Sequence, residues 1–272
     1  MASTMKSLIT PSILALLAAA TPARAQDTPV LEQLAAHNVV GDSPSQDTRA
    51  KPNILIILAD DLGYGDVKRY NPERGKIPTP NIDKLASQGM LFTDAHTSSG
   101  VCSPTRYTLL TGRYHWRTRL QSYVLNYLDG PLIAPGRLTL ASLLKQNGYR
   151  TGAIGKWHLG WDFQFTADER QRLQSYGGKA GGGGKVNTAV TNEDLAAWRT
   201  IYARQFRGGP LACGFDSYFG TDVPNFPPYC FIENDRTVGI PSELLAADAF
   251  RKNQADIQGP AVPGWKLEDV LP

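Results

Sequence analysis

The stretch KPNILIILADDLGYGD, residues 51–66, decides the fold that the sequence predicts. Its run from Asn53 to Leu58 is apolar and rich in isoleucine, as is typical of a parallel strand that is covered on both faces. Two adjacent acids, Asp60 and Asp61, follow this run. Because ligands of α/β proteins bind beyond the carboxyl ends of the strands, these acids mark a candidate site.

The segments that follow alternate between helix and strand patterns. Capping residues and terminal glycines predict helices over about 79–89, 103–111, 139–147 and 192–206. Apolar or alternating runs predict strands at 90–97 and 151–155, and strand or turn elements at 214–220 and 229–235. We therefore expect an α/β fold with a mostly parallel central sheet flanked by helices.

The first 25 residues have the pattern of a secretory signal peptide of bacterial type. Lys6 precedes an apolar run over 8–20, and the triplet ARA at 23–25 places cleavage after Ala25. A membrane anchor is the alternative, but the run is shorter than the about 20 apolar residues that span a bilayer. We expect a periplasmic or secreted protein without stable membrane insertion, with a disordered leader over the polar residues 26–50.

The net charge bears on which kind of partner the chain could bind. The formal net charge of +3 falls to +1 without the signal peptide, because that segment holds Lys6 and Arg24 and no acid. This balance does not favour nucleic acid as a partner.

Of the three cysteines, Cys213 and Cys230 form either a disulfide or two buried thiols, and Cys102 is left over.

Cys102 lies where a strand pattern gives way to a helix pattern, with Arg106 one helical turn later. A lone cysteine is most often a buried structural thiol, but a helix start beside an arginine is electropositive and favours an anion or an activated group. Lys156 and His158, in GKWHLG at 155–160, are two apart on an extended segment, so they point to the same side.

The two acids after the first predicted strand are a candidate metal site. For Asp60 and Asp61 the alternative is a solvated turn or a helix cap. Two carboxylates after a buried strand repel each other unless a cation neutralises them, and oxygen ligands of this type suit calcium or magnesium.

Together these segments resemble the sulfatase family. Its first signature, Cys-x-Pro-x-Arg followed by Thr-Gly-Arg, is matched by CSPTR at 102–106 and TGR at 111–113. Its second, Gly-Tyr-x-Thr-x-x-x-Gly-Lys-Trp-His-Leu-Gly, is matched without a break by GYRTGAIGKWHLG at 148–160. The opening PNILIILADDLGYGD and the later GFDSYFG are also similar, so the resemblance covers about residues 51–240.

The resemblance implies a sulfatase-like fold of the alkaline phosphatase superfamily and arylsulfatase-like hydrolysis of sulfate esters. In that family a separate formylglycine-generating enzyme, a transient partner, oxidises the signature cysteine, here Cys102, to formylglycine. One hydroxyl of the hydrated aldehyde attacks sulfur and expels the alcohol, and loss of a proton from the other releases the sulfate. The substrate is expected to be a small sulfate ester or a sulfated sugar.

The resemblance also implies what the basic residues do. Arg106 would orient the hydrated aldehyde and share its charge. Lys156 would bind the sulfate, and His158 would be the base that triggers its release.

The resemblance further implies a calcium ion held by Asp60, Asp61 and the formylglycine made from Cys102. Calcium takes about 6–8 oxygen ligands, and family members supply the rest from a downstream Asp-Asn or Asp-His pair that does not follow here. We therefore expect residues 51–272 to be the N-terminal part of a catalytic domain, with the C-terminal part of the fold missing. The alternatives are an inactive fragment, or a phosphonate or phosphate monoester hydrolase with the same chemistry.

Overall fold

A computed structural model describes residues 51–177, 189–246 and 257–266. The predicted signal peptide and leader lie outside these ranges. Within the chain, contacts gather into two units, residues 1–57 and residues 58–272.

The strand predicted over 53–58 is wrong, because this run has no regular secondary structure. Its side chains are exposed, with 84% of Leu55 and 82% of Ile57 accessible to solvent. A strand is stable only when a neighbour takes its backbone hydrogen bonds, and no strand of the described residues pairs with this run. The strand predicted over 90–97 is wrong for the same reason, and that segment is a loop.

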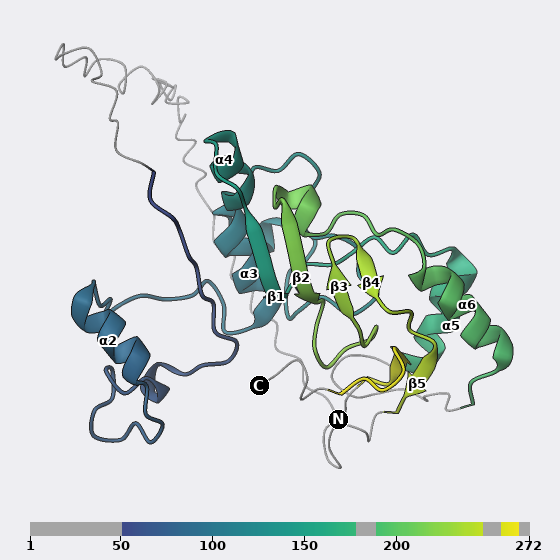
Figure 1. The fold of residues 1–272 in the computed structure, drawn as a ribbon, viewed down its shortest axis with the longest axis horizontal. Coiled ribbons are helices and arrows are strands. Elements are labelled where there is room, and N and C mark those ends of the chain that lie inside the picture. Colours follow the sequence, from purple (N-terminus) through teal and green to yellow (C-terminus); the bar gives the residue numbers. More distant parts are fainter. Residues whose placement is uncertain (1–50, 178–188, 247–256, 267–272) are drawn as a thin grey trace, which may run out of the picture. The chain divides into compact units, whose positions relative to one another are not determined.

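The second unit is built on a mixed four-stranded sheet. Its strands are β1 (Gly152–Lys156), β2 (Ser217–Thr221), β3 (Phe231–Glu233) and β4 (Arg236–Val238), in that order across the sheet (Figure 1). β1 and β2 are parallel, with Lys156 opposite Thr221, and the other two pairs are antiparallel. A separate antiparallel pair joins β5 (Glu243–Leu245) to β6 (Gly259–Ala261). The α/β class is confirmed, and parallel pairing among the described strands is limited to β1 and β2.

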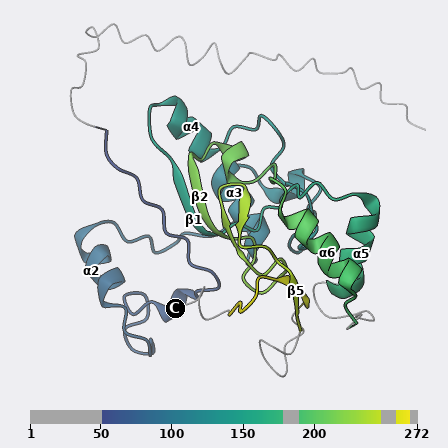
Figure 2. The ribbon, with the colours of Figure 1, turned by 45° about the vertical axis from the view of Figure 1, so that its right-hand side comes forward.

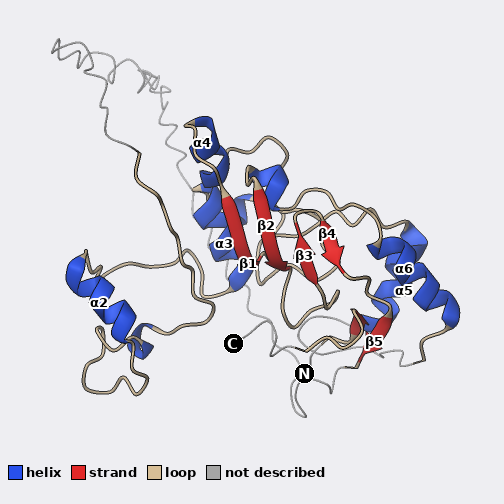
Figure 3. Cartoon of the chain, viewed as in Figure 1, coloured by secondary structure: helices blue, strands red, loops and turns tan. Residues whose placement is uncertain are grey.

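Three helices form close to the predicted ends: α2 (Pro80–Gln88), α3 (Cys102–Thr111) and α4 (Leu140–Gln146). Gly112, with φ 64°, and Gly148, with φ 81°, adopt the left-handed backbone that ends α3 and α4. Loops, tan in Figure 3, connect these helices. The described chain also has three 3₁₀ turns: η1 (Tyr64–Asp66) before α2, η2 (His115–Arg117) between α3 and α4, and η3 (Pro210–Cys213) before β2.

α5 (Ala167–Gly177) and α6 (Asn192–Tyr202) lie side by side, as Figures 1 and 2 both show. The carboxylate of Asp194, buried at the start of α6, accepts hydrogen bonds from Arg172 and from the Tyr176 hydroxyl of α5. These bonds hold the two helices together. In the described part of the chain, no helix has the length and apolar composition needed to cross a bilayer.

The core packs around the loop that follows β1. Trp157, Leu159, Trp161 and Phe163 are all at most 5% exposed. The ring of Trp161 contacts Tyr218 of β2 and other aromatic side chains of the same cluster. Because every second side chain of this loop is anchored in the core, the loop has little freedom to move.

Cys213 and Cys230 are both free thiols in this core, so the alternative of a disulfide does not hold. Burial raises the pKa of the Cys213 thiol to about 12 and that of Cys230 still further. Both thiols are therefore inert packing residues at neutral pH.

Candidate active site

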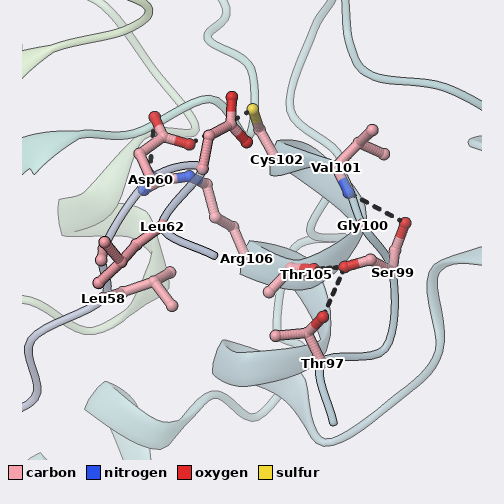
Figure 4. A pocket seen from close by; sticks show the side chains of 12 residues that line it. Leu58, Asp60, Leu62, Thr97, Ser99, Gly100, Val101, Cys102, Thr105 and Arg106 are labelled. Carbon is pink, nitrogen blue, oxygen red and sulfur yellow. Dashed lines mark hydrogen bonds and ion pairs between the residues drawn. The ribbon is translucent and has the colours of Figure 1, made fainter. Parts of the chain in front are cut away.

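The carboxyl end of β1 brings three predicted site residues into contact. Lys156, the last residue of β1, places its Nζ 2.7 Å from Asp60 Oδ2 and 3.1 Å from Cys102 Sγ. The Cys102 thiol in turn donates to Asp60 Oδ1 at 3.6 Å, and Figure 4 shows these two side chains facing each other. Residues that are up to 96 positions apart in the sequence thus share one cluster.

Arg106 joins the cluster from α3. Cys102 is the first residue of α3 and Arg106 lies one turn later, so both side chains lie on the same face of the helix. Arg106 Nη1 donates to the main-chain oxygen of Lys156 at 2.5 Å, and Nη2 lies 3.7 Å from Asp60 Oδ2. The N-terminus of α3 adds its partial positive charge to that of these cations.

The cations keep the Asp60 carboxyl ionised. Partial burial alone would raise the pKa of this carboxyl, but the hydrogen bond and charge of Lys156, with the charge of Arg106, outweigh it. The pKa of Asp60 therefore lies below its ordinary value. One carboxylate faces two cations, so the cluster attracts an anionic group.

His158, two residues beyond β1, is fixed by contacts on three sides. Its Nε2 lies 3.0 Å from the main-chain oxygen of Leu125, and its ring meets the ring of Phe226 edge-on at 5.9 Å. Its backbone N–H donates to the main-chain oxygen of Asp222 at 3.0 Å and to Asp222 Oδ1 at 3.2 Å. A carbonyl oxygen can only accept, so Nε2 carries the proton and Nδ1 keeps its lone pair.

The imidazole of His158 is a neutral base at neutral pH. Its pKa is lowered to about 4, mainly by burial and also by the positive charges of Lys156 and Arg106. The hydrogen bond to Leu125 acts in the opposite direction but is outweighed. Its Nδ1 is buried, and no described residue donates a hydrogen bond to it. A neutral imidazole with a free lone pair can accept a proton.

Ser103 connects the His158 loop to α3. The buried Ser103 hydroxyl accepts the N–H of Leu125 at 3.1 Å, and the carbonyl of Leu125 then binds His158. The residue after Cys102 therefore helps to place the imidazole.

Sequence reasoning missed Ser103, Leu125 and Asp222. Leu125 acts through a main-chain carbonyl, which every residue has, so no residue-type pattern could have identified it. Asp222 did carry a signal, because an acid directly follows the segment that forms β2.

The acidic residues do not complete a calcium site. Asp61 lines the same open pocket as Asp60 and Cys102, but Asp60 is bonded to the Lys156 ammonium. Among the described residues, no three His, Cys, Asp or Glu side chains gather as a metal site requires. Since calcium takes about 6–8 oxygen ligands, these residues alone do not fit it.

The pocket beside Cys102 combines charge with apolar walls. Residues 58–62 and residues 97, 99–102, 105 and 106 line it (Figure 4). Leu58, Leu62 and Val101 supply apolar surface, whereas Arg106 supplies positive charge and Asp60 and Asp61 supply negative charge. The anionic end of a ligand would pair with Arg106, and a less polar remainder would contact the apolar side chains.

A family model described as Sulfatase matches residues 52–205. This range is more than half of the 272 residues and contains every predicted site residue. It also contains both signatures on which the resemblance was based.

Curated relatives match a shorter segment. An N-acetylgalactosamine-6-O-sulfatase of Bacteroides thetaiotaomicron is 44% identical over 119 residues, which cover 40% of this chain and 21% of that protein. Arylsulfatase H of Homo sapiens is 46% identical over 117 residues, covering 41% and 20%. Arylsulfatase G of Canis lupus familiaris is 47% identical over 120 residues, covering 43% and 22%. The match thus spans about a fifth of the length of these curated relatives.

The fold is also similar to that of a solved structure from a study of the metabolism of multiple glycosaminoglycans by Bacteroides thetaiotaomicron. The TM-score is 0.54 at 30% sequence identity, and the match covers 76% of this chain and 36% of the other.

Proposed function

The chain belongs to the sulfatase family, and on this premise we propose that it hydrolyses sulfate esters. The observation that carries the proposal is the contact of Lys156 with both Asp60 and Cys102 at the carboxyl end of β1. Cys102 and Lys156 come from the two separate family signatures, and Arg106 lies beside them. A sulfate ester would bring its anionic group to the place where these residues meet.

Formylglycine at Cys102 is part of the proposal. Cys102 is partly exposed at the edge of the pocket and begins the motif CSPTR, which supports its role as the modified residue. The hydrated aldehyde would supply the oxygen nucleophile that attacks sulfur. A formylglycine-generating enzyme is then the transient partner, and residues 1–25 are proposed to direct export as a signal peptide.

The chain's own residues would bind the substrate and move a proton. Arg106 and Lys156 hold the sulfate oxygens, and stabilise the negative charge that develops on them. His158 accepts a proton at Nδ1, the ring nitrogen that has its lone pair free. The hydrogen bond from Nε2 to Leu125 keeps the ring in that tautomer.

Calcium also belongs to the proposal, with Asp60 and Asp61 as part of its ligand set. When bound it would supply positive charge beside the sulfate. The described residues offer too few oxygen ligands to hold it alone, so the roles given above to Arg106, Lys156 and His158 do not depend on it.

The proposed substrate class is an aryl sulfate or a sulfated sugar. Relatives named arylsulfatase and N-acetylgalactosamine-6-O-sulfatase support both. The apolar surface of Leu58, Leu62 and Val101 beside the charged end of the pocket is compatible with either.

The test is an assay of the chain co-expressed with a formylglycine-generating enzyme. We expect turnover of 4-nitrophenyl sulfate above that of 4-nitrophenyl phosphate and of the matching phosphonate, and none with Cys102→Ala. Peptide mass of residues 102–106 should show the loss that accompanies conversion of the thiol to an aldehyde. Faster turnover of a phosphorus ester, or an active enzyme with an unmodified thiol, would contradict the proposal.

A further inference from the structure

We propose that Asp222 is a positioning residue, whose carboxylate holds the backbone of His158 in the left-handed conformation that places the imidazole. The importance of this placement for turnover rests on the proposed function. The contact itself does not depend on that function, and it can be tested separately.

The position of Asp222 follows from the register of β1 and β2, the one parallel pair among the described strands. Lys156 lies opposite Thr221, so the residues after β1 and β2 leave the same edge of the sheet together. The hydrogen bonding continues past the strands, with the N–H of Trp157 on the Thr221 oxygen at 2.9 Å and that of His158 on the Asp222 oxygen at 3.0 Å. The carboxylate of Asp222 then takes the His158 N–H as well, through Oδ1 at 3.2 Å.

The backbone of His158 needs such support. Its φ is 50°, a region that residues other than glycine rarely adopt and that costs about 1–3 kcal/mol when surrounding structure enforces it. The imidazole is held from the far side by the Leu125 carbonyl, and the peptide group is held by Asp222. Two anchors at opposite ends of one residue determine where its Nδ1 lies.

The burial of Asp222 argues that this carboxylate is retained for a purpose. Asp222 is 6% exposed, and a buried carboxyl destabilises the fold unless its interactions offset the loss of water. Burial raises the pKa of Asp222 to about 7, although the hydrogen bond from the His158 N–H and the nearby positive charges act to lower it. The titratable groups that interact electrostatically with it are Lys156 of β1, Arg106 of α3, Tyr218 of β2 and Cys230, which directly precedes β3. A strongly shifted acid beside a candidate base is typical of a functional site.

The first experiment measures thermal unfolding of the chain and of Asp222→Asn at several pH values. Because the pKa of Asp222 is raised in the folded state, its contribution to the free energy of unfolding is fully present below about pH 4. This contribution is lost as the pH rises through about 7. Asn cannot ionise, so the Tm of the variant relative to the wild type should rise by at least about 4 °C between pH 5 and pH 8. A constant difference would contradict a buried ionisable carboxyl.

Asp216→Asn is the matched control, at a position six residues earlier that directly precedes β2. Its hydrogen bonds with Lys145 and Thr151 lower the pKa of Asp216 to about 2. The contribution of Asp216 to the free energy of unfolding is therefore fully present above about pH 4 and constant between pH 5 and pH 8. The control should lose stability equally at both pH values.

The second experiment tests positioning. The chain has four histidines, so ¹⁵N-histidine labelling gives few amide signals, and His158→Gln identifies that of His158. Asp222→Ala should shift the His158 amide signal, whereas Asp222→Asn, which keeps an accepting oxygen, should leave it close to the wild-type position. An Ala variant that is folded and has an unshifted amide would overturn the proposal.

Turnover provides the functional arm. For 4-nitrophenyl sulfate, Asp222→Ala should lower kcat about 10–100-fold with little change in KM, and Asp222→Asn should restore most of it. Equal kcat values per folded molecule for wild type and Ala would refute positioning. If the wild type shows no turnover, the proposed function fails, while the amide signal and the pH series still decide whether Asp222 holds His158.

Discussion

Lys156 contacts two of the residues on which the proposed chemistry depends. Its ammonium lies 2.7 Å from Asp60 and 3.1 Å from Cys102, and its main-chain oxygen binds Arg106. The side chain thus keeps Asp60 ionised and also holds positive charge beside the sulfur. Both effects depend on the same charged atom, so one substitution should remove both.

For Lys156→Met we expect the pKa of Asp60 to rise. Burial already favours the protonated carboxyl, and Arg106 at 3.7 Å is the remaining cation of the cluster. We also expect kcat/KM for a sulfate ester to fall by about 10²-fold or more, since a charge that stabilises the reacting anion is lost. Carboxyl ¹³C titration by NMR measures the first effect, and steady-state kinetics the second.

Lys145→Met is the control for this substitution. Lys145 also forms an ion pair of 2.7 Å with an aspartate, Asp216, but at the surface away from the cluster. It should change neither the pKa of Asp60 nor turnover. An unchanged Asp60 titration in Lys156→Met would show that the ion pair does not control this carboxyl.

Single site residues could be predicted from the sequence where the side-chain type carries the chemistry. Cys102, Arg106, Lys156 and Asp60 were all identified in this way, and the structure brings them together. Contacts made by the main chain could not be identified, as the role of Leu125 illustrates. The sequence also could not tell that Asp61, next to Asp60, lies outside the contact network.

At the scale of elements, helices were predictable because their signals are local. Pro80 begins α2, and Gly112 and Gly148 end α3 and α4, as residue types at single positions suggested. Strands depend on partners that are distant in sequence, so composition alone is not sufficient. The segment 151–155 became β1 because β2 pairs with it, whereas 53–58 has no partner among the described strands.

The loop that follows β1 should be sensitive at Gly160. Its φ is 82°, and a Cβ there would lie 2.2 Å from the main-chain oxygen of Gly130. For Gly160→Ala we expect a loss of unfolding free energy of about 3 kcal/mol or more, since backbone strain and a steric clash add together. Urea unfolding measures the loss.

Gly136→Ala separates these two causes. Gly136 has a similar φ of 74°, but a Cβ there would meet nothing within 4 Å. Its substitution should cost only about 1 kcal/mol, the contribution of the backbone alone. Equal losses for the two variants would mean that the contact with Gly130 is relieved at no cost.

At the scale of the whole molecule, the apolar run 54–58 stands out because it is exposed. Large contiguous apolar surfaces on soluble proteins usually mark association or aggregation. We expect the chain to self-associate at micromolar concentration, and Leu55→Asp with Ile57→Asp to reduce this association. Light scattering after size-exclusion chromatography measures it.

Leu138→Asp is a suitable control for the apolar run. Leu138 is 51% exposed, and isolated exposed leucines are normal on a protein surface. This substitution should leave the association unchanged. A wild-type chain that remains monomeric over the same concentrations would contradict the expectation.

The burial of part of the motif CSPTR determines when Cys102 could be oxidised relative to folding. Once α3 has formed, Ser103 is inaccessible and Pro104 is less than 2% exposed, although Cys102 itself is partly open. An enzyme that reads these five residues as a sequence needs access to all of them, which the folded chain denies. The proposed oxidation of Cys102 therefore has to precede the folding of α3, and a chain that folds first would keep its thiol.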